Sequence, residues 1–328
     1  MEELINSVIE GDCIEVMKKF PDNFVDAVIT DPPYGINILN LKWDKFKRDE
    51  YIIFTTKWGQ EVYRILKPGG YLLSFSSIKT MHYQLIAFED IGFENRNCIF
   101  YLYSNKFIGT WRVADLYMKK GIDLSFWKGW GYNIVISCDP ILVLRKSFEK
   151  DLVTNLLKWN IGLMNLEACK IGQEMHKHEF KKCRSKKFYK SLGDYKSILK
   201  GRLPKNVIFG CTCNSGNNGY HSFDCVCYGL GNAVKYYYCV DFVKKTEHPT
   251  EKPLELLMYL VKLVVPKGGL LLDCFAGSGT TLIACKKLGY RYIGIEKEKE
   301  YCDLARKRLE QVEKECEEKE KELTLFDI

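Results

Sequence analysis

The sequence contains no long uninterrupted hydrophobic run. Its longest apolar stretch, residues 256–265, is interrupted by Lys262 and is about half as long as a membrane-spanning helix needs to be. No basic segment followed by an apolar one stands near Met1. We therefore expect no secretory signal, no membrane association and a cytoplasmic location. No internal repeat is evident.

The pattern of cysteines lacks the features of a disulfide scaffold, although the chain has 14 of them. Most stand singly in apolar segments, as Cys98, Cys274 and Cys285 do, which suits a reducing compartment. The 328 residues suffice for one large domain or two modest ones. A composition of 46% hydrophobic and 28% charged residues is typical of a globular protein with a substantial core.

Strand-like and helix-like segments alternate at both ends of the chain, whereas residues 104–247 lose this alternation. Such alternation predicts parallel strands joined by helical crossovers. The expected strands are residues 25–30, 71–75, 98–103, 270–274 and 291–296; the expected helices are residues 14–20, 53–66, 82–91, 253–265, 280–288 and 300 to about 322; residues 67–70 are an expected turn. The sequence thus predicts one α/β sheet that a large insertion divides.

The segment Asp31-Pro32-Pro33-Tyr34 follows the apolar run at residues 25–30. Proline cannot continue a sheet ladder, so the strand must end there, with Asp31 at the edge where ligands bind in open α/β sheets. The turn would present a carboxylate, a backbone carbonyl and a flat ring, which suit a planar base that carries an amino group. An ordinary strand-to-loop exit remains an alternative for these four residues alone.

A second strand-like segment ends in Asp273 and leads into a loop of small residues with Gly277 and Gly279. Glycines let the backbone approach a ligand closely, and the helix start that follows offers free N–H groups. Glu296 lies 17 residues beyond Gly279, where nucleotide-binding folds carry the acid that binds ribose. The loop lacks both the phosphate-binding Gly-Lys-Ser/Thr and the full dinucleotide fingerprint. Two acids around such a loop suit a nucleoside with a cationic substituent, as in S-adenosyl-L-methionine.

Taken together and in this order, the motifs resemble those of site-specific DNA amino-methyltransferases of the permuted β class, within the N4/N6 methyltransferase family. In that class the catalytic motif precedes the cofactor motif. The resemblance extends over nearly the whole chain. The residues that carry it are 11–12 with 31–35, 127–131, 139–141, 162–169, 201–206, 236–238, 248–253 and 275–281.

This resemblance implies a Rossmann-like sheet of the S-adenosylmethionine-dependent methyltransferase type, with helices on both faces and an inserted target-recognition region. Residues 1–103 would form the catalytic half of the methyltransferase domain. Residues 104–247 would form the DNA-binding insertion, and residues 248–328 the cofactor-binding half with a charged C-terminal helix.

The resemblance also assigns roles to individual residues. Asp31 and the carbonyl of Pro32 would accept both N–H bonds of an exocyclic amine, while Pro33 stiffens the turn and Tyr34 stacks on a base flipped out of the duplex. Residues of the cofactor site would be Asp12, Thr250, Lys252, Asp273, Phe275, Ala276, Gly277, Ser278, Gly279, Thr280 and Glu296. Within this set Asp273 and the glycine loop would hold the methionine part, Glu296 the ribose and Asp12 the adenine. A turn acid is the alternative for Asp12.

Four functions compete at this point. Methylation of the N6 amine of adenine in DNA comes first, because the motif begins with Asp31, whereas cytosine-N4 enzymes of this class more often begin it with Ser. Methylation of cytosine N4 comes second, since both amines offer the same two N–H donors. An RNA or protein methyltransferase is third, because the order of the motifs argues against it. A DNA-binding module without catalysis is fourth.

The inserted region is the expected DNA reader. Residues 176–205 hold nine lysines and two arginines against two acids, which points to a polyanion, although a solvated lysine-rich loop is the alternative. Trp111, Trp127, Trp130 and Tyr132 could wedge into or stack on DNA, or each could belong to a core. The expected partners are double-stranded DNA and a cognate restriction endonuclease in a restriction-modification pair. The protein would be a monomer or a homodimer.

Two close pairs of cysteines flank a Gly/Asn-rich loop in the same region. Four thiolates could form a tetrahedral zinc site that stabilises a loop-rich segment, although one residue within each pair is tighter than the usual spacing. Free thiols in a variable loop are the alternative. The candidate zinc ligands are Cys211, Cys213, Cys225 and Cys227.

Overall fold

The computed structural model describes residues 1–37, 42–103, 117–118, 120–128, 130, 138–170, 206–211, 238–241 and 251–326. Within these residues one sheet has the strand order β1-β9-β8-β2-β3-β5-β4-β6-β7. The strands are β1 (Ser7–Glu10), β2 (Val25–Thr30), β3 (Leu66–Phe75), β4 (Phe93–Tyr103), β5 (Cys138–Lys146), β6 (Val207–Cys211), β7 (Tyr238–Asp241), β8 (Leu270–Asp273) and β9 (Arg291–Glu296).

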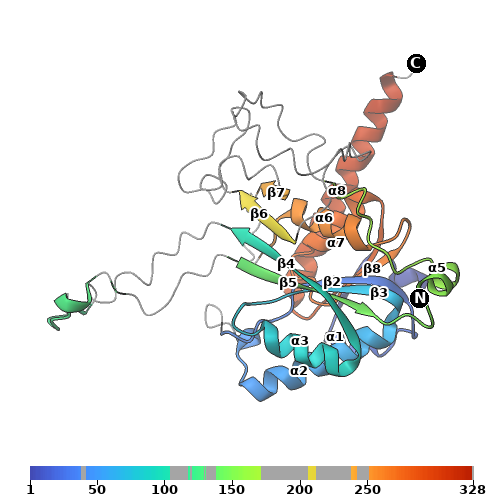
Figure 1. Cartoon of the computed structure of the whole chain (residues 1–328). Helices are drawn as coiled ribbons and strands as arrows, with labels where there is room; N and C mark the ends of the chain where they lie inside the picture. Colours follow the sequence, from blue (N-terminus) through green and yellow to red (C-terminus); the bar gives the residue numbers. More distant parts are fainter. Residues whose placement is uncertain are drawn as a thin grey trace, which may run out of the picture.

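Helices cover both faces of this sheet (Figure 1). The α-helices are α1 (Cys13–Met17), α2 (Arg48–Ile65), α3 (Met81–Ile91), α5 (Leu152–Trp159), α6 (Leu254–Val264), α7 (Thr280–Leu288) and α8 (Lys299–Phe326). Short 3-10 turns are η1 (Glu2–Leu4), η3 (Lys42–Asp44) and η4 (Ser125–Trp127). In the part of the chain that the structure describes, no helix combines the length and apolarity needed to cross a membrane.

The two faces of the sheet carry separate hydrophobic cores, because side chains of a strand alternate between faces. Val28 of β2 packs in one core with residues of α1, α2 and α3, whereas its neighbours Ala27 and Ile29 pack in the other with residues of α6, α7 and α8. All three are fully buried. This arrangement confirms the predicted α/β sheet with helices on both faces.

Strand direction determines where the functional edge lies. β1, β9, β8, β2 and β3 pair in parallel, and β5 is antiparallel to both β3 and β4. The carboxyl ends of the five parallel strands therefore meet at one edge, where open α/β sheets bind ligands.

The structure differs from the sequence-based expectation at several places. β1 was missed, because it has only four residues and two of them are polar, Ser7 and Glu10. β5, β6 and β7 all lie within residues 104–247, so the predicted insertion contains three of the described strands of the main sheet. The predicted turn at residues 67–70 is a bulge inside β3, where pairing passes from Val25–Leu66 to Ala27–Tyr71. Gly69 has a positive φ of 81° in this bulge, which explains why a turn signal appears within a strand.

The buried carboxylate of Asp26 joins three strands near the end of the sheet opposite the functional edge. Its Oδ1 accepts a hydrogen bond from Lys67 Nζ at 2.6 Å, and its Oδ2 accepts one from the backbone N–H of Leu270 at 2.6 Å. Asp26 is 4% exposed. Because Leu270 begins β8, this contact ties the amino-terminal and carboxyl-terminal halves of the sheet together.

We expect Asp26→Ala to lower the free energy of unfolding by about 2–4 kcal/mol, because it leaves a lysine and a buried N–H without their acceptor. Urea denaturation would measure this. Asp22→Ala is the matched control, since Asp22 pairs with Arg64 at the surface, where its side chain is 69% exposed. That control should cost less than about 1 kcal/mol. Equal losses in the two variants would contradict the structural role of Asp26.

Candidate cofactor and catalytic site

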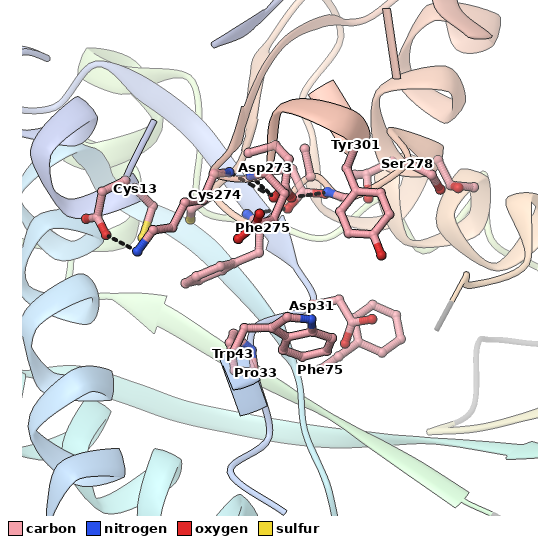
Figure 2. A pocket seen from close by; sticks show the side chains of 18 of the residues that line it. Cys13, Asp31, Pro33, Trp43, Phe75, Asp273, Cys274, Phe275, Ser278 and Tyr301 are labelled. Atoms are coloured by element: carbon pink, nitrogen blue, oxygen red, sulfur yellow. Dashed lines mark hydrogen bonds and ion pairs between the residues drawn. The ribbon is translucent and has the colours of Figure 1, made fainter. Parts of the chain in front are cut away.

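A cavity of about 430 Å³ opens at the carboxyl ends of the parallel strands. This volume falls within the usual range for small-molecule sites. Asp31, Pro33, Trp43 and Phe75 group together along it, and Asp273 with Phe275 lies across from them (Figure 2). Residues from both ends of the chain thus line one cavity.

Most of the residues predicted from sequence line this cavity. They are Asp12, Asp31, Pro33, Lys252, Asp273, Phe275, Ala276, Gly277, Ser278, Thr280 and Glu296. Pro32 is buried and does not line the cavity, and Gly279 packs on α8. Tyr34 reaches the site through its hydroxyl group, which contacts Asp31. Thr250 lies outside the described residues.

Asp273 forms the junction between the catalytic and cofactor halves. Its Oδ1 accepts hydrogen bonds from Thr30 Oγ1 at 2.7 Å and from the backbone N–H of Phe275 at 3.1 Å. The residue is 2% exposed, and burial raises the pKa of its carboxyl group from 3.8 to about 6. The hydrogen bonds from Thr30 and Phe275 oppose that increase in pKa without cancelling it.

The two loop glycines have different reasons to be glycine. Gly277 has a φ of 50°, and its N–H donates to Glu296 Oε2 at 2.7 Å. Gly279 has a φ of 80°, and a Cβ there would lie 2.8 Å from the Cβ of Ala305 on α8. Gly279 is therefore needed for the close packing of the loop on α8, whereas sequence reasoning had attributed both glycines to a ligand.

Glu296 and Asp12 lie at the carboxyl ends of the neighbouring strands β9 and β1. Glu296 Oε1 accepts the backbone N–H groups of Lys297 and Glu298, both at 2.8 Å, so the carboxylate is held between the glycine loop and the end of β9. Asp12 is the N-cap of α1, where its Oδ1 accepts from Ile14 N at 3.1 Å. The turn-acid interpretation of Asp12 thus describes its local role, and its side chain also borders the cavity.

Asp31 is held by two side chains. Tyr34 donates its hydroxyl hydrogen to Oδ1 at 2.7 Å, and Lys252 donates to Oδ2 at 2.6 Å. Burial, together with Asp139 and Asp31, raises the pKa of Tyr34 well above its ordinary value, so the phenol stays neutral and remains a donor. Burial alone would lower the pKa of Lys252, but Asp31 and Asp139 reverse this and raise it, so the ammonium keeps its charge.

Sequence reasoning gave no role to three residues at or behind this site, Trp43, Asp139 and Arg308. Trp43 stands in the cavity beside Pro33, and Asp139 lies 3.6 Å from Lys252 Nζ. Arg308 of α8 donates to Glu251 Oε1 at 2.8 Å and to the Ser278 carbonyl at 2.7 Å, which attaches α8 to the loop that carries Lys252. Asp139 belongs to residues 139–141, one of the motifs that carry the family resemblance. The charged pattern of α8, in contrast, gave no sign that Arg308 contacts the site.

The predicted zinc ligands cannot be placed as a group. Cys213, Cys225 and Cys227 lie outside the described residues, and Cys211 ends β6. Among the residues that the structure does describe, no cluster of three or more metal-ligating side chains occurs. The basic segment at residues 176–205 also lies outside the described residues.

Comparison with known proteins identifies the family. The model N6_N4_Mtase, described as DNA methylase, matches residues 25–307. The chain belongs to this family of DNA methylases. The resemblance inferred from the motifs is thereby confirmed.

Individual relatives agree with this assignment. The Type II methyltransferase M.HindIII of Haemophilus influenzae is 24% identical over 93% of this chain and 96% of its own length. M.HpaI of Haemophilus parainfluenzae, also a Type II methyltransferase, is 28% identical over 92% of this chain and 74% of its own length.

Solved structures show the same fold. The PvuII DNA methyltransferase, which is cytosine-N4-specific, has a TM-score of 0.55 at 16% identity and covers 94% of this chain and 90% of its own. A DNA modification methylase from Thermus thermophilus, complexed with S-adenosyl-L-methionine, has a TM-score of 0.51 at 19% identity, with 93% of each chain covered.

We expect Asp273→Asn to raise the free energy of unfolding by up to about 2–3 kcal/mol at pH 7.5, because asparagine keeps the acceptor for Thr30 and removes a buried charge. The folded-state pKa of about 6 exceeds the ordinary 3.8, so ionisation destabilises the folded state as pH rises through this range. The gain should therefore shrink from pH 6 downward and vanish near pH 4. Denaturant titrations across this range would measure it, with exposed Asp90→Asn as a control that should show no such trend. A variant less stable than wild type at pH 7.5 would contradict the argument.

Proposed function

We propose that the protein transfers a methyl group from S-adenosyl-L-methionine to the exocyclic N6 amine of a flipped adenine in duplex DNA. One observation carries this proposal: the carboxylate of Asp31 borders the same cavity as the glycine loop and the acids Asp273 and Glu296. A DNA methylase needs a methyl donor and a target amine at one place, and this cavity holds candidate groups for both.

The chemistry of the cavity fits the proposed cofactor. Asp273 and the backbone of the glycine loop would hold the amino acid part, and Glu296 and Asp12 would accept hydrogen bonds from ribose and adenine. Phe275 offers an apolar ring to the base and is itself held by an edge-on contact with Trp58, at 5.5 Å between centroids. When bound, the cofactor supplies an electrophilic methyl group on a sulfonium. The acids around it suit that positive charge.

The role of Asp31 follows from the electronic structure of the target. The lone pair of an exocyclic amine is delocalised into the base, so the amine is a weak nucleophile. Acceptance of its N–H bonds by Asp31 and the Pro32 carbonyl would localise the lone pair on nitrogen and direct it toward the methyl group. Tyr34 would stack on the base once it has left the duplex. No covalent intermediate with the protein is needed.

The inserted region is the proposed reader of the DNA sequence. Phe126, Trp127 and Trp130 are 82%, 49% and 65% exposed, and the ring of Trp127 makes T-shaped contacts with those of Phe126 and Trp130. Exposed aromatic rings that stack on or wedge between bases are a common means of DNA contact. A cognate restriction endonuclease remains the proposed biological partner.

We expect DNA from a methylation-deficient host that expresses the protein to contain N6-methyladenine. Digestion to nucleosides and mass spectrometry would measure it, and sequencing of modified positions would give the recognition site. N4-methylcytosine in place of N6-methyladenine would support the second candidate and contradict the choice of adenine. Absence of any methylated base would contradict methyl transfer to DNA.

We expect Asp31→Ala to lower kcat by at least about 100-fold, because the amine loses its principal acceptor. The variant should still bind S-adenosyl-L-methionine, which calorimetry would measure. Asp49→Ala, an exposed substitution in the first turn of α2, is the control for handling and folding. Turnover of Asp31→Ala equal to that of wild type on a cognate duplex would remove Asp31 from the mechanism.

A further inference from the structure

The ammonium group of Lys252 lies against the catalytic motif. Its Nζ donates to Asp31 Oδ2 at 2.6 Å and to the Tyr34 hydroxyl oxygen at 3.2 Å. The same ammonium lies 5.5 Å from the centroid of the Tyr34 ring and 5.0 Å from that of Phe75. The side chain of Lys252 is only 10% exposed, so these contacts define its position closely.

These contacts are of the kind that the proposed mechanism gives to the target base. The base would place an N–H donor on Asp31 and a ring against Tyr34, and Lys252 already places an ammonium donor on Asp31 and its charge near Tyr34. Two donors cannot occupy the same lone pair at hydrogen-bond distance. Oδ2 has a second lone pair, so the target amine competes with Lys252 for this oxygen and takes the position of the ammonium only where Lys252 withdraws.

The carboxylate of Asp139 is a second possible acceptor close to the ammonium group of Lys252. Asp139 Oδ2 is 3.6 Å from Lys252 Nζ, and Asp139 Oδ1 accepts a hydrogen bond from the Tyr103 hydroxyl at 3.1 Å. A movement of roughly 1 Å would bring Nζ to hydrogen-bond distance from Asp139. Because Tyr103 and Asp139 lie on the paired strands β4 and β5, this second acceptor has a rigid support.

The charges favour such an exchange. Asp31 and Asp139 share one ammonium, so either carboxylate can be its main partner. Burial and the neighbouring Asp31 raise the pKa of Asp139, whereas Lys252 and Tyr103 lower it, so the charge of Asp139 depends on the ammonium beside it. Asp273 lies across the cavity, and the charge of Asp31 contributes to the raised pKa of Asp273.

We propose that Lys252 is a positioning residue that fills the acceptor site of Asp31 in the absence of DNA and passes to Asp139 when the target amine arrives. This inference rests on the proposed function. Lys252 then keeps the Asp31 carboxylate hydrogen-bonded and oriented before the base enters. Asp139, which accepts a hydrogen bond from Tyr103, is the alternative acceptor for the ammonium group. Asp139 acts through Lys252 and makes no contact with the base in this scheme.

The proposal predicts an effect on KM for DNA that exceeds any effect on kcat. Asp139→Asn removes the charge of the alternative acceptor, so Lys252 stays on Asp31 and competes with the target amine. Competition of this kind divides the intrinsic dissociation constant by the competent fraction and so raises it, which means that KM for a cognate duplex should rise about 10- to 100-fold, and by more than kcat falls. Asn keeps the shape of Asp139 and an acceptor for Tyr103.

The double variant Lys252→Met/Asp139→Asn distinguishes competition from a general loss of structure. Without the competing ammonium, KM for the duplex should return to within about threefold of wild type. Lys252→Met alone removes the competitor, so KM for the duplex should be no higher than that of wild type, whereas kcat should fall because Asp31 loses the partner that positions it. Lys262→Met removes a lysine from the same helix region away from the cavity and is the matched control, with an unchanged KM expected.

The measurement uses the full chain, a duplex with the site found by sequencing, and calorimetric titration with S-adenosyl-L-methionine to verify folding of each variant. An unchanged KM in Asp139→Asn, an equal rise in the double variant, or a raised KM in Lys252→Met would each overturn the proposal. If Asp139→Asn does not bind the cofactor, the KM of Lys252→Met for the duplex still tests the proposal. Absence of methylation by wild type would overturn the proposed function as well, whereas active wild type with these variant results would overturn this inference alone.

Discussion

The parallel pairing of β2 with β8 is the contact on which the site depends. These strands come from opposite ends of the chain, and the hydrogen bond from Thr30 to Asp273 joins residues 243 positions apart. Because the two strands run in the same direction, the loops after them open at the same edge, and Asp31 meets the glycine loop there. Asp26 joins the same strands again through its bond to Leu270. The rest of the sheet supports this junction, and both Thr30 and Asp273 are buried.

The site gathers more negative charge than it neutralises. Asp31, Asp273 and Glu296 border the cavity, Asp139 lies beside it, and Lys252 is the cation in contact with two of these carboxylates. Burial is the main cause of the raised pKa of Asp273, and the charge of Asp31 adds to it. Such strain is typical of functional sites, where a cationic ligand would relieve it. The proposed sulfonium cofactor and the exchange of Lys252 between carboxylates both follow from this excess of acid.

The carboxyl-terminal helix α8 belongs to the site in a way that its charge pattern conceals. Arg308 fastens Glu251 and the backbone of Ser278, while Ala305 receives Gly279 at close range. These contacts place the loop before α6, and hence Lys252, against the motif after β2. α8 thus influences the position of Asp31 indirectly, because Arg308 holds Glu251 and the neighbouring Lys252 holds Asp31.

Local signals in the sequence were enough for the α/β class, the family, and most of the cavity. Prolines after an apolar strand, and small residues between Asp273 and a helix start, have the same meaning wherever they occur, because they reflect backbone geometry. The sequence could not reveal β1, which is short and partly polar, or β5, which lies inside an irregular region and enters the sheet only by pairing with β3 and β4. It could not show that Lys252 lies on Asp31 with Asp139 beside it, that Trp43 lies next to Pro33, or that Arg308 holds Glu251. The amino-acid sequence by itself determined which chemical groups are present. Only the tertiary structure decided which of these groups contact one another, because the contacts of the site join strands and loops that are distant in sequence.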